Sequence, residues 1–357
     1  MRAVVTRRHG GPEVVEYHAV WPDPEPGPGE VLLRVGACGL NNTDVNTRTG
    51  WYSKVVSSGT RDADATTPLP ADASWGGMPI TFPLIQGADV CGVVVSGDDA
   101  LMGRRVLVDP WLRDPAAPDD AARATYLGSE RDGGFAELVA VPRANVHPVD
   151  AALSDVELAS FPTAYVTALN MLRRAALRGG ETVLVTGASG GVGGALIQLA
   201  RAVGATPIAL TDRAKEARVR ASGAAAVVPR DAPDLAGALG ALGVRDLDVV
   251  ADVAGGARFP ELLRVLRHGG RYTCAGAIAG PLVELDLRTM YLRDLTLVGA
   301  TVPPRDAFAD LVAHIEGSRV QPLVAASYPL ERFHEAQAAF VAKAHAGNIV
   351  IDLTGDH

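Results

Sequence analysis

Hydrophobic and polar residues follow two different patterns along the 357-residue chain. Residues 1 to about 150 carry short apolar runs, such as VLLRV and CGVVV, that are broken by glycine and proline. Runs of this length between turn residues are typical of antiparallel strands. The pattern therefore predicts a mostly β, partly barrel-like domain in this part of the chain.

From about residue 155, apolar strands alternate with helices. Buried strands are predicted for the runs ETVLVTG, TPIALT, AAVVP, LDVVADVAG and RYTCAGA. Helical spacing of apolar residues predicts helices for GVGGALIQLARAVG, KEARVRASG and PELLRVLRHGG, which lie between them. Strands separated by such helices form a parallel sheet that is covered on both faces. The predicted fold class is α/β, with a doubly wound parallel sheet joined to a mostly β domain.

Two further segments complete the pattern. LTLVGAT (295–301) is predicted to be a strand at the edge of the parallel sheet, and NIVIDL near the C-terminus is predicted to be another strand. Residues 53–80 are polar, aperiodic and rich in proline and glycine. Loops of this length usually form lids or binding loops, or are disordered.

Length, charge and cysteine content limit the function classes. A chain of this length is expected to form two domains. The formal net charge of -8 argues against nucleic acid and anionic membrane surfaces as partners. No apolar run approaches the ~20 residues of a membrane span, and the N-terminus lacks the apolar core of a signal peptide. The three cysteines are far apart and form no CxxC pair, which predicts a protein of the reducing cytoplasm.

The segment VLVTGASGGVGGALIQL (183–199) places a glycine cluster between a predicted strand and a predicted helix. It fits the dinucleotide-binding pattern as A-x-G-x-x-G, with alanine in place of the first glycine. Gly190 would let the backbone approach a pyrophosphate, Gly193 would allow close helix packing, and the helix N-terminus would supply N–H groups. The predicted phosphate-binding residues are Ala188, Ser189, Gly190, Gly191, Val192 and Gly193.

The same segment allows two other interpretations. GASGG (187–191) also matches G-x-S-x-G, which would make Ser189 the nucleophile of a hydrolase. That enzyme needs an acid and then a histidine at later strand ends. His314 and His334 fall inside predicted helices, and His268 ends one, so their positions argue against it. The remaining interpretation is a structural glycine-rich turn that binds nothing.

The choice of nicotinamide nucleotide depends on LTDRAKEAR, which includes the end of the next strand. Asp212 lies 19 residues after Gly193, where an acid can bind both ribose hydroxyls and select NAD. Arg213 and Lys215 follow, where they can pair with a 2′-phosphate and select NADP. A solvated turn, with Asp212 capping the next helix, is the alternative without a ligand. These residues alone leave both nucleotides open.

Six segments together resemble a known family over essentially the full chain: GLNNTDVNTRTGWY (39–52), QGADVCGVVV (86–95), DGGFAELVAVP (132–142), FPTAYVTAL (161–169), VTGASGGVGGALIQLARAVGA (185–205) and GGRYTCAGAIAG (269–280). The chain resembles the medium-chain dehydrogenase/reductase superfamily, and especially its zinc-free quinone oxidoreductase and enoyl reductase branch. The resemblance implies a GroES-like catalytic domain at 1–150, completed by 303–357, and a Rossmann domain at 151–302. It also implies that the cofactor binds in the cleft between them.

The resemblance makes zinc a sharp test. The zinc alcohol dehydrogenases hold their catalytic zinc with two cysteines and a histidine, at positions that here look like Asn41, Ala88 and Thr163. None of these side chains replaces a thiolate or an imidazole well. The four-cysteine lobe of the structural zinc is also absent from the sequence. We therefore expect an enzyme without zinc.

Without a metal, the oxidation of a simple alcohol lacks its Lewis acid. Reduction of a quinone or an activated C=C bond is easier, because the conjugated carbonyl accepts the charge. The family motif places an asparagine and a tyrosine at this site, which look like Asn41 and Tyr52. Tyr52 is then a candidate proton donor or oxyanion partner. The alternative is a half-buried aromatic residue at the start of a loop.

The resemblance also bears on the cofactor. Counted back from Gly223, the acid of the NAD-dependent relatives falls on Leu210. Lys215 falls where NADPH-dependent quinone reductases carry a phosphate-binding lysine. This favours NADPH, while Asp212 keeps NADH as the alternative. Thr167 matches a threonine that approaches the nicotinamide in relatives, or else it bonds its own helix backbone.

The 53–80 loop departs from the resemblance, because short quinone reductases pass from the tyrosine to the next strand with far fewer residues. Since the loop starts at Tyr52, we expect it over or beside the substrate cleft. Trp51, Trp75 and Met78 would then line a pocket for an aromatic or polyketide-like substrate. The alternative is an excursion on the surface.

The sequence thus predicts a cytoplasmic, zinc-independent, NADPH-dependent reductase of quinones or α,β-unsaturated carbonyl compounds. Its substrate would be a small molecule. In the family the edge strand often pairs two Rossmann sheets, so LTLVGAT indicates a homodimer. The alternatives are a non-catalytic NADP(H)-binding protein and, further from the pattern, a serine hydrolase that uses Ser189.

Overall fold

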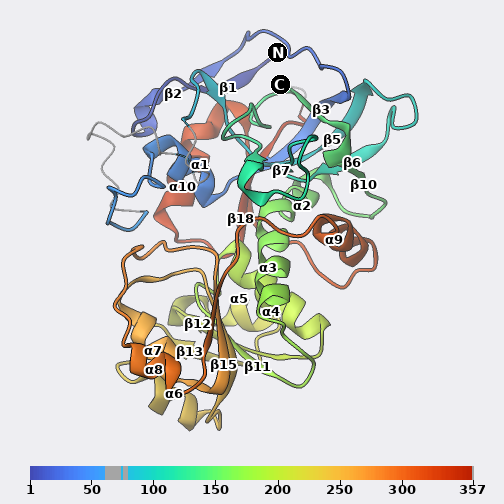
Figure 1. The fold of residues 1–357 in the computed structure, drawn as a ribbon. Helices are drawn as coiled ribbons and strands as arrows, with labels where there is room; N and C mark the ends of the chain where they lie inside the picture. Colours follow the sequence, from blue (N-terminus) through green and yellow to red (C-terminus); the bar gives the residue numbers. More distant parts are fainter. Residues whose placement is uncertain (61–73, 75–78, 356–357) are drawn as a thin grey trace. The chain divides into compact units, whose positions relative to one another are not determined.

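The computed structural model describes residues 1–60, 74 and 79–355 (Figure 1). The chain divides into two compact units. The first unit consists of Met1–Val56, Asp62–Thr163 and Pro322–His357, and the second of Ser57–Arg61 and Ala164–Gln321. Among the described residues, no helix has the length and apolar character that crossing a membrane requires.

The first unit is organised around a seven-stranded sheet with the order β10-β6-β5-β3-β18-β17 and with β9 paired to β3. Its pairs are antiparallel except β17 with β18. This confirms the mostly β, antiparallel domain that the short apolar runs predict. The strands are β3 (Glu30–Gly39), β5 (Asp89–Ser96), β6 (Arg105–Val108), β9 (Leu138–Pro142), β10 (Val146–Pro148), β17 (Val324–Pro329) and β18 (Asn348–Asp352).

Two smaller sheets complete the first unit. One has the strand order β2-β1-β4, and the other consists of β7 and β8. The unit has its own apolar core, in which the rings of Phe135 and Phe333 lie 4.8 Å apart. The remaining elements are β1 (Ala3–Thr6), β2 (Val15–His18), β4 (Leu84–Ile85), β7 (Trp111–Leu112), β8 (Thr125–Tyr126), α1 (Asn42–Thr49), α2 (Asp155–Leu158) and α10 (Phe333–Ala342).

The second unit contains a six-stranded parallel sheet with the order β13-β12-β11-β14-β15-β16. The strands progress outward in both directions from β11 and β14, so the winding reverses between these two neighbours. Ligands of such sheets bind at the carboxyl ends of the strands, at this point of reversal. The strands are β11 (Thr182–Val185), β12 (Thr206–Thr211), β13 (Ala226–Pro229), β14 (Leu247–Asp252), β15 (Leu266–Cys274) and β16 (Thr296–Gly299).

Helices alternate with the strands of the second unit along the chain, and α6 and α7 share one apolar cluster with the sheet. Leu184 and Val250 contribute to this cluster from neighbouring strands, and Leu262 contributes from a helix. The helices are α3 (Pro162–Arg174, which starts in the first unit), α4 (Gly191–Ala202), α5 (Glu216–Ala221), α6 (Leu235–Ala241), α7 (Phe259–Arg264), α8 (Leu287–Tyr291) and α9 (Ala307–Glu316).

The segment PELLRVLRHGG differs from its predicted helix. α7 ends at Arg264, and β15 already begins at Leu266. The register between β14 and β15 shifts after Leu247, so that the extra residues bulge out of the ladder. Gly269 has a φ of 68° there, a left-handed conformation that favours glycine. Gly269 and Gly270 therefore lie in a β-bulge, and His268 belongs to β15 instead of ending a helix.

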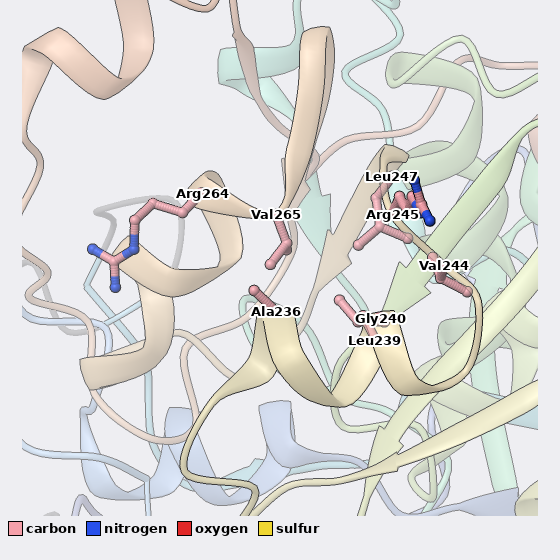
Figure 2. Close-up of a pocket in the computed structure, with 8 residues that line it drawn as sticks. All are labelled: Ala236, Leu239, Gly240, Val244, Arg245, Leu247, Arg264 and Val265. Carbon is pink, nitrogen blue, oxygen red and sulfur yellow. The ribbon is translucent and has the colours of Figure 1, made fainter.

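A pocket of about 250 Å³ lies between α6 and the segment that joins α7 to β15 (Figure 2). Leu247, the first residue of β14, and Val265, directly before β15, both line it. The pocket is therefore at the amino ends of these strands. Ligand sites of doubly wound sheets lie at the opposite, carboxyl ends, so this pocket is separate from the candidate site.

Candidate active site

The glycine-rich segment forms a tight connection between β11 and α4. β11 ends at Val185, and α4 begins directly after its N-cap residue, Gly190. Gly187 has a φ of 55°, which places it in the left-handed region. A Cβ on Gly193 would lie 2.2 Å from the carbonyl oxygen of Gly187. Only glycine therefore lets the first turn of the helix pack this closely on the loop.

The outer side of the same loop is open. Gly190 is exposed, and a Cβ there would meet only the carbonyl oxygen of Gly187, at 3.4 Å. Ala188 is buried, whereas the residues Ser189, Gly191 and Val192 are half-buried. The first N–H groups of a helix have no partners within the helix, and they attract anions. The shape of the loop therefore suits a pyrophosphate.

A buried carboxylate holds this loop. Asp252, the last residue of β14, accepts hydrogen bonds from the hydroxyls of Thr186 (2.5 Å) and Tyr272 (2.6 Å). It also accepts the backbone N–H groups of Ala254 (2.8 Å) and Gly255 (3.1 Å). Burial and the charge of Asp252 raise the pKa of Tyr272, so this hydroxyl keeps its proton and remains a donor. Asp252 thereby ties the carboxyl ends of β11, β14 and β15 together.

The first half of the sheet ends in a charged corner. Asp212 directly follows β12, and its Oδ1 lies 2.5 Å from Nε of Arg230, which directly follows β13. The N–H of Arg230 also donates to the carbonyl of Thr211 at 2.8 Å. Two predicted residues, Arg213 and Lys215, form the next turn after Asp212. The ends of β12 and β13 therefore carry three cations and two acids, because Asp231 also lies 4.0 Å from Nε of Arg213.

Leu210 and Asp212 have different environments. Leu210 lies inside β12 and is buried in the apolar cluster of the sheet. Asp212 is the first residue after the strand, and its side chain is 34% exposed. A ligand at the carboxyl end of β12 would therefore meet Asp212, although the register drawn from the resemblance points to Leu210.

The hydrolase alternative finds little support in the second unit. Ser189 is half-buried in the glycine-rich loop. Among the described residues of this unit, the histidines are His268 in β15 and His314 in α9. Neither follows the carboxyl end of a strand, where a triad histidine would have to lie. Thr167, predicted beside the nicotinamide, is half-buried on α3 in this unit.

In the first unit, α1 is a polar helix that the fold buries. Its sequence is NTDVNTRT, and its residues from Asp44 to Thr49 are all buried. Buried polar groups need hydrogen-bond partners. Nη1 of Arg48 donates to the carbonyl of Gly10 at 2.8 Å, and Nε2 of Gln86 donates to the carbonyl of Asp44 at 2.8 Å. This network fixes both ends of α1, where the two predicted catalytic residues lie.

Asn41 lies at the N-cap of α1 and belongs to a hydrogen-bonded array. Its Nδ2 donates to Oδ2 of Asp89 at 2.9 Å. The other carboxylate oxygen of Asp89 accepts the backbone N–H of Thr163 at 2.7 Å. The hydroxyls of Thr163 and Tyr126 lie 2.7 Å apart. Two of the positions that the resemblance assigns to zinc ligands, Asn41 and Thr163, are thus joined through one carboxylate.

The acids beside this array are perturbed. Burial raises the pKa of Asp89 to about 6, although hydrogen bonds from Asn41 and Thr163 oppose the rise. Burial raises the pKa of Asp44 to about 8, and the charge of Asp89 adds to the rise. Asp44 accepts the backbone N–H of Asn41 at 2.7 Å. It acts as a hydrogen-bond acceptor at the start of α1.

Tyr52 follows the other end of α1. The helix ends at Gly50 in a left-handed conformation with a φ of 68°, and the N–H of Trp51 returns to the carbonyl of Asn46 at 2.8 Å. Tyr52 is half-buried, and its ring contacts that of Trp51 at a centroid distance of 5.6 Å. Burial raises the pKa of Tyr52, and hydrogen bonds with Thr43 and Asn46 oppose the rise. The hydroxyl is therefore protonated and available as a donor at neutral pH.

The residues present do not fit a catalytic zinc. Within the described ranges, no group of three or more His, Cys, Asp or Glu side chains could hold a metal ion. At the three positions that the resemblance points to, this chain has an amide, a methyl group and a hydroxyl. Asn41 already uses its amide for Asp89, and Thr163 uses its backbone for the same carboxylate.

Most of the 53–80 loop, with Trp75 and Met78, lies outside the described residues. Residues 57–60 belong to the second unit, where the N–H of Thr60 donates to the carbonyl of Ile278 at 3.2 Å. Gly59 is buried there. The chain therefore passes from Tyr52 in the first unit to a contact within the second unit.

Sequence reasoning missed four residues that organise these sites. Asp89 and Asp252 lie at the ends of apolar strands. A single acid next to a hydrophobic run is a pattern that could have indicated their role. Arg230 follows the strand AVVP, and in the fold it adds a cation beside the basic turn that is predicted after TPIALT. Tyr126 gave no signal, because only the pairing of β7 with β8 brings it to Thr163.

Comparisons with known proteins cover the whole chain. The alcohol dehydrogenase GroES-like domain matches residues 27–151, and a model described as zinc-binding dehydrogenase matches residues 191–317. A solved structure from Sinorhizobium meliloti, provisionally described as an alcohol dehydrogenase, has 48% sequence identity and a TM-score of 0.89. That match covers 99% of this chain and 96% of the other.

Two relatives have more specific names. An acryloyl-coenzyme A reductase of Metallosphaera sedula is 28% identical over 98% of this chain and 99% of the relative. The quinone oxidoreductase of Thermus thermophilus, solved also in complex with NADPH, is 30% identical with a TM-score of 0.72. Its match covers 99% of this chain and 100% of that chain.

The fold, the glycine-rich loop and these matches agree with the resemblance found in the sequence. The chain belongs to the medium-chain dehydrogenase/reductase superfamily, in its quinone oxidoreductase-like branch, and is an oxidoreductase.

Proposed function

We propose that the protein is a zinc-independent, NADPH-dependent reductase of quinones or α,β-unsaturated carbonyl compounds. The observation that carries this proposal is the array of Asn41, Asp89 and Thr163, in which two ligand positions of the zinc enzymes hold hydrogen-bonding groups instead. The names of the quinone oxidoreductase and acryloyl-coenzyme A reductase relatives support the substrate classes. Three free cysteines support the expectation of a reducing compartment such as the cytoplasm.

The cofactor site is proposed at the carboxyl edge of the parallel sheet. The loop from Ala188 to Gly193 has the open outer face and the glycine cradle that a pyrophosphate requires. The nicotinamide end then lies toward β14 and β15, with Thr167 as the proposed contact from α3. When bound, NADPH supplies a hydride to the electrophilic carbon of the substrate.

The charged corner supports NADPH over NADH. Asp212 alone would favour NADH by accepting the two ribose hydroxyls. Its ion pair with Arg230 offsets that charge, and Arg213 and Lys215 add cations in the following turn. Cations grouped at the end of β12 suit the 2′-phosphate of NADPH.

The substrate site is proposed in the first unit. Reduction of a conjugated carbonyl places negative charge on the carbonyl oxygen, so the site needs a donor aimed at that oxygen. Tyr52 is this donor, because its raised pKa keeps its hydroxyl protonated. Asn41 is the second substrate residue, held by Asp89 at the start of α1.

A homodimer is proposed through the edge of the parallel sheet. β16 pairs only with β15 in the sheet of this chain, so among the described strands its other edge has no neighbour. The segment before it carries four large apolar side chains that are 59% to 74% exposed: Leu282, Leu287, Tyr291 and Leu292. Such edges and apolar groups are usually covered. Sedimentation of the protein should give twice the chain mass, and Leu287→Glu with Leu292→Glu should give the chain mass.

The test of function uses one sample. NADPH and NADH are titrated by nicotinamide fluorescence, and then a quinone or an enone is added. The proposal expects tighter binding of NADPH and its oxidation after addition. Tyr52→Phe should bind NADPH normally and reduce kcat by about a hundredfold to a thousandfold, the effect of losing one donor to the developing charge.

The two alternatives give different results in the same experiment. A non-catalytic NADP(H)-binding protein would bind NADPH without oxidising it, and Tyr52→Phe would change nothing. A hydrolase would bind neither nucleotide and would be labelled by a fluorophosphonate at Ser189.

A further inference from the structure

The array around Asp89 has two layers. Asn41 and Thr163 are half-buried, so part of each residue is open to solvent. Asp89 and Tyr126, with exposed fractions of 2% and 4%, lie behind them. The buried pair makes its contacts with the two accessible residues through bonds of 2.7 to 2.9 Å. This arrangement separates residues that a substrate can touch from residues that hold them.

We propose that Asp89 is the positioning residue of this site, and that it acts by orienting Asn41 and Thr163 toward the substrate, with Tyr126 fixing the hydroxyl of Thr163. The proposal rests on the reductase function proposed above. In it, one buried carboxylate joins Asn41 and Thr163, two of the three positions at which the zinc enzymes hold their metal ion.

The ionised carboxylate determines how the Asn41 amide is turned. A carboxylate only accepts hydrogen bonds, so the NH2 group of Asn41 must face it. The same NH2 group is 3.5 Å from the carbonyl of Gly39. Both of its hydrogens therefore point to protein acceptors. Asn41 cannot donate to the substrate oxygen in this state, which leaves that task to the hydroxyl group of Tyr52.

Thr163 connects the two layers. Its backbone N–H donates to Asp89, and its hydroxyl bonds both Asp89 and Tyr126, so both the main chain and the side chain are fixed. The Tyr126 ring also packs edge-on against Trp111 at a centroid distance of 4.8 Å. Burial raises the pKa of Tyr126, and the charge of Asp89 adds to the rise. Tyr126 therefore remains protonated and can donate to Thr163 throughout the working range.

Three titratable groups face Asp89 from neighbouring elements: Asp44 on α1, Cys38 on β3 and Tyr126 on β8. Burial raises the pKa of each of them. At neutral pH they are largely uncharged, so Asp89 is the first of the set to ionise as the pH rises. Protonation of Asp89 would let the side-chain amide of Asn41 rotate by 180°, so that its oxygen faces Asp89, because a carboxylic acid can donate as well as accept.

The first experiment compares the pH profile of kcat for the wild type and Asp89→Asn, with NADPH and the better acceptor. In the wild type, kcat should fall below a pH of about 6, where Asp89 gains a proton. In Asp89→Asn this acid limb should be absent, and kcat should be reduced about tenfold or more, the size of a lost charged hydrogen bond. The dissociation constant of NADPH should not change. An unaltered pH profile and kcat in Asp89→Asn would overturn the proposal.

A second pair of variants keeps the Asp89 carboxylate and changes one of its partners, Thr163. Thr163→Val keeps the side-chain volume and the backbone bond to Asp89 but loses the hydroxyl, and Thr163→Ser keeps the hydroxyl. The proposal expects Thr163→Val to lower kcat several-fold, and Thr163→Ser to restore most of it. Equal kcat values for the two variants would contradict it, even if Asp89→Asn did not fold.

The same data separate this inference from the proposed function. A wild-type protein that binds NADPH but oxidises it with neither acceptor rejects the reductase function, and with it this role of Asp89. A wild type that turns over normally while Asp89→Asn and Thr163→Val do the same rejects the inference alone.

Discussion

The guanidinium Nε of Arg230 lies 2.5 Å from Oδ1 of Asp212, at the ends of two neighbouring parallel strands. The acid and the base come from consecutive strands, β12 and β13, and they meet where a dinucleotide places its adenosine ribose. The pair is partly exposed, so it contributes little to stability. In the proposed cofactor site its effect is electrostatic, because the cation compensates the charge of Asp212.

Arg230→Ala should therefore change the cofactor preference. Loss of one charged hydrogen bond to the 2′-phosphate should weaken NADPH binding by about 1.5 to 3 kcal/mol, or about tenfold to a hundredfold. NADH binding should stay equal or improve, because Asp212 becomes free to accept ribose hydroxyls. Fluorescence titration with both nucleotides measures the ratio. Arg220→Ala is the matched control, since Arg220 pairs with Glu216 on α5 instead.

Gly193 and Gly190 should respond differently to alanine. Gly193→Ala puts a Cβ 2.2 Å from a backbone oxygen, so we expect the free energy of unfolding to fall by about 1 to 3 kcal/mol. NADPH binding should weaken as well, because the loop is distorted. Gly190→Ala has room for the Cβ and a φ of -84°, so the melting temperature should hold. Its methyl group still points to the open face, and NADPH should bind more weakly. Equal melting temperatures for both variants would contradict the geometry of the loop.

Asp44 should make the protein less stable as the pH rises. Its folded-state pKa is about 8, above the ordinary value of 3.8, so the native state binds more protons than the unfolded state between these values. Stability then decreases with pH across this window, by up to about 5 kcal/mol. Urea unfolding at pH 5 and pH 8 measures the slope. Asp44→Asn keeps an acceptor for the N–H of Asn41 and should remove most of this pH dependence of stability. If the pH dependence persists in the variant, other groups such as Asp89 cause it.

Strands and long helices were predictable because their patterns are local. TPIALT coincides with β12 over all of its residues, since an apolar run between turn residues has few alternatives. α1 was not predicted as a helix, because NTDVNTRT has no apolar face. Its stability comes from partners such as Gly10 and Gln86, which are distant in the sequence. Burial of a polar helix cannot be read from periodicity.

The candidate site also has a part that the sequence predicts and a part that depends on distant contacts. The residues of the glycine-rich loop are contiguous, so their arrangement follows from one motif between a strand and a helix. The array in the first unit joins Asn41, Asp89, Tyr126 and Thr163, which four different elements supply. Only the pairing of strands brings such residues together. The resemblance identified the positions of Asn41 and Thr163, but it did not indicate that Asp89 connects them.

Gly59 offers a last prediction, which concerns the segment after Tyr52. A Cβ on Gly59 would lie 2.6 Å from the carbonyl oxygen of Ile278, the same oxygen that accepts the N–H of Thr60 at 3.2 Å. The loop around Ile278 is bonded in turn to the loop after β14, where the N–H of Ala279 donates to the carbonyl of Ala254 at 2.9 Å. The segment is therefore anchored to the loops that follow β14 and β15.

Gly59→Ala should break this anchor. Loss of the hydrogen bond, worth about 0.5 to 1.5 kcal/mol, should speed hydrogen exchange at the Thr60 amide by about twofold to tenfold. Ser57→Ala is the control, because Ser57 is exposed and its change adds no contact. If NADPH fixes the loops beyond β14 and β15, it should slow exchange at Thr60 in the wild type and in Ser57→Ala but not in Gly59→Ala. Exchange at Thr60 that is equally fast in all three proteins would show that the segment is not held by Ile278.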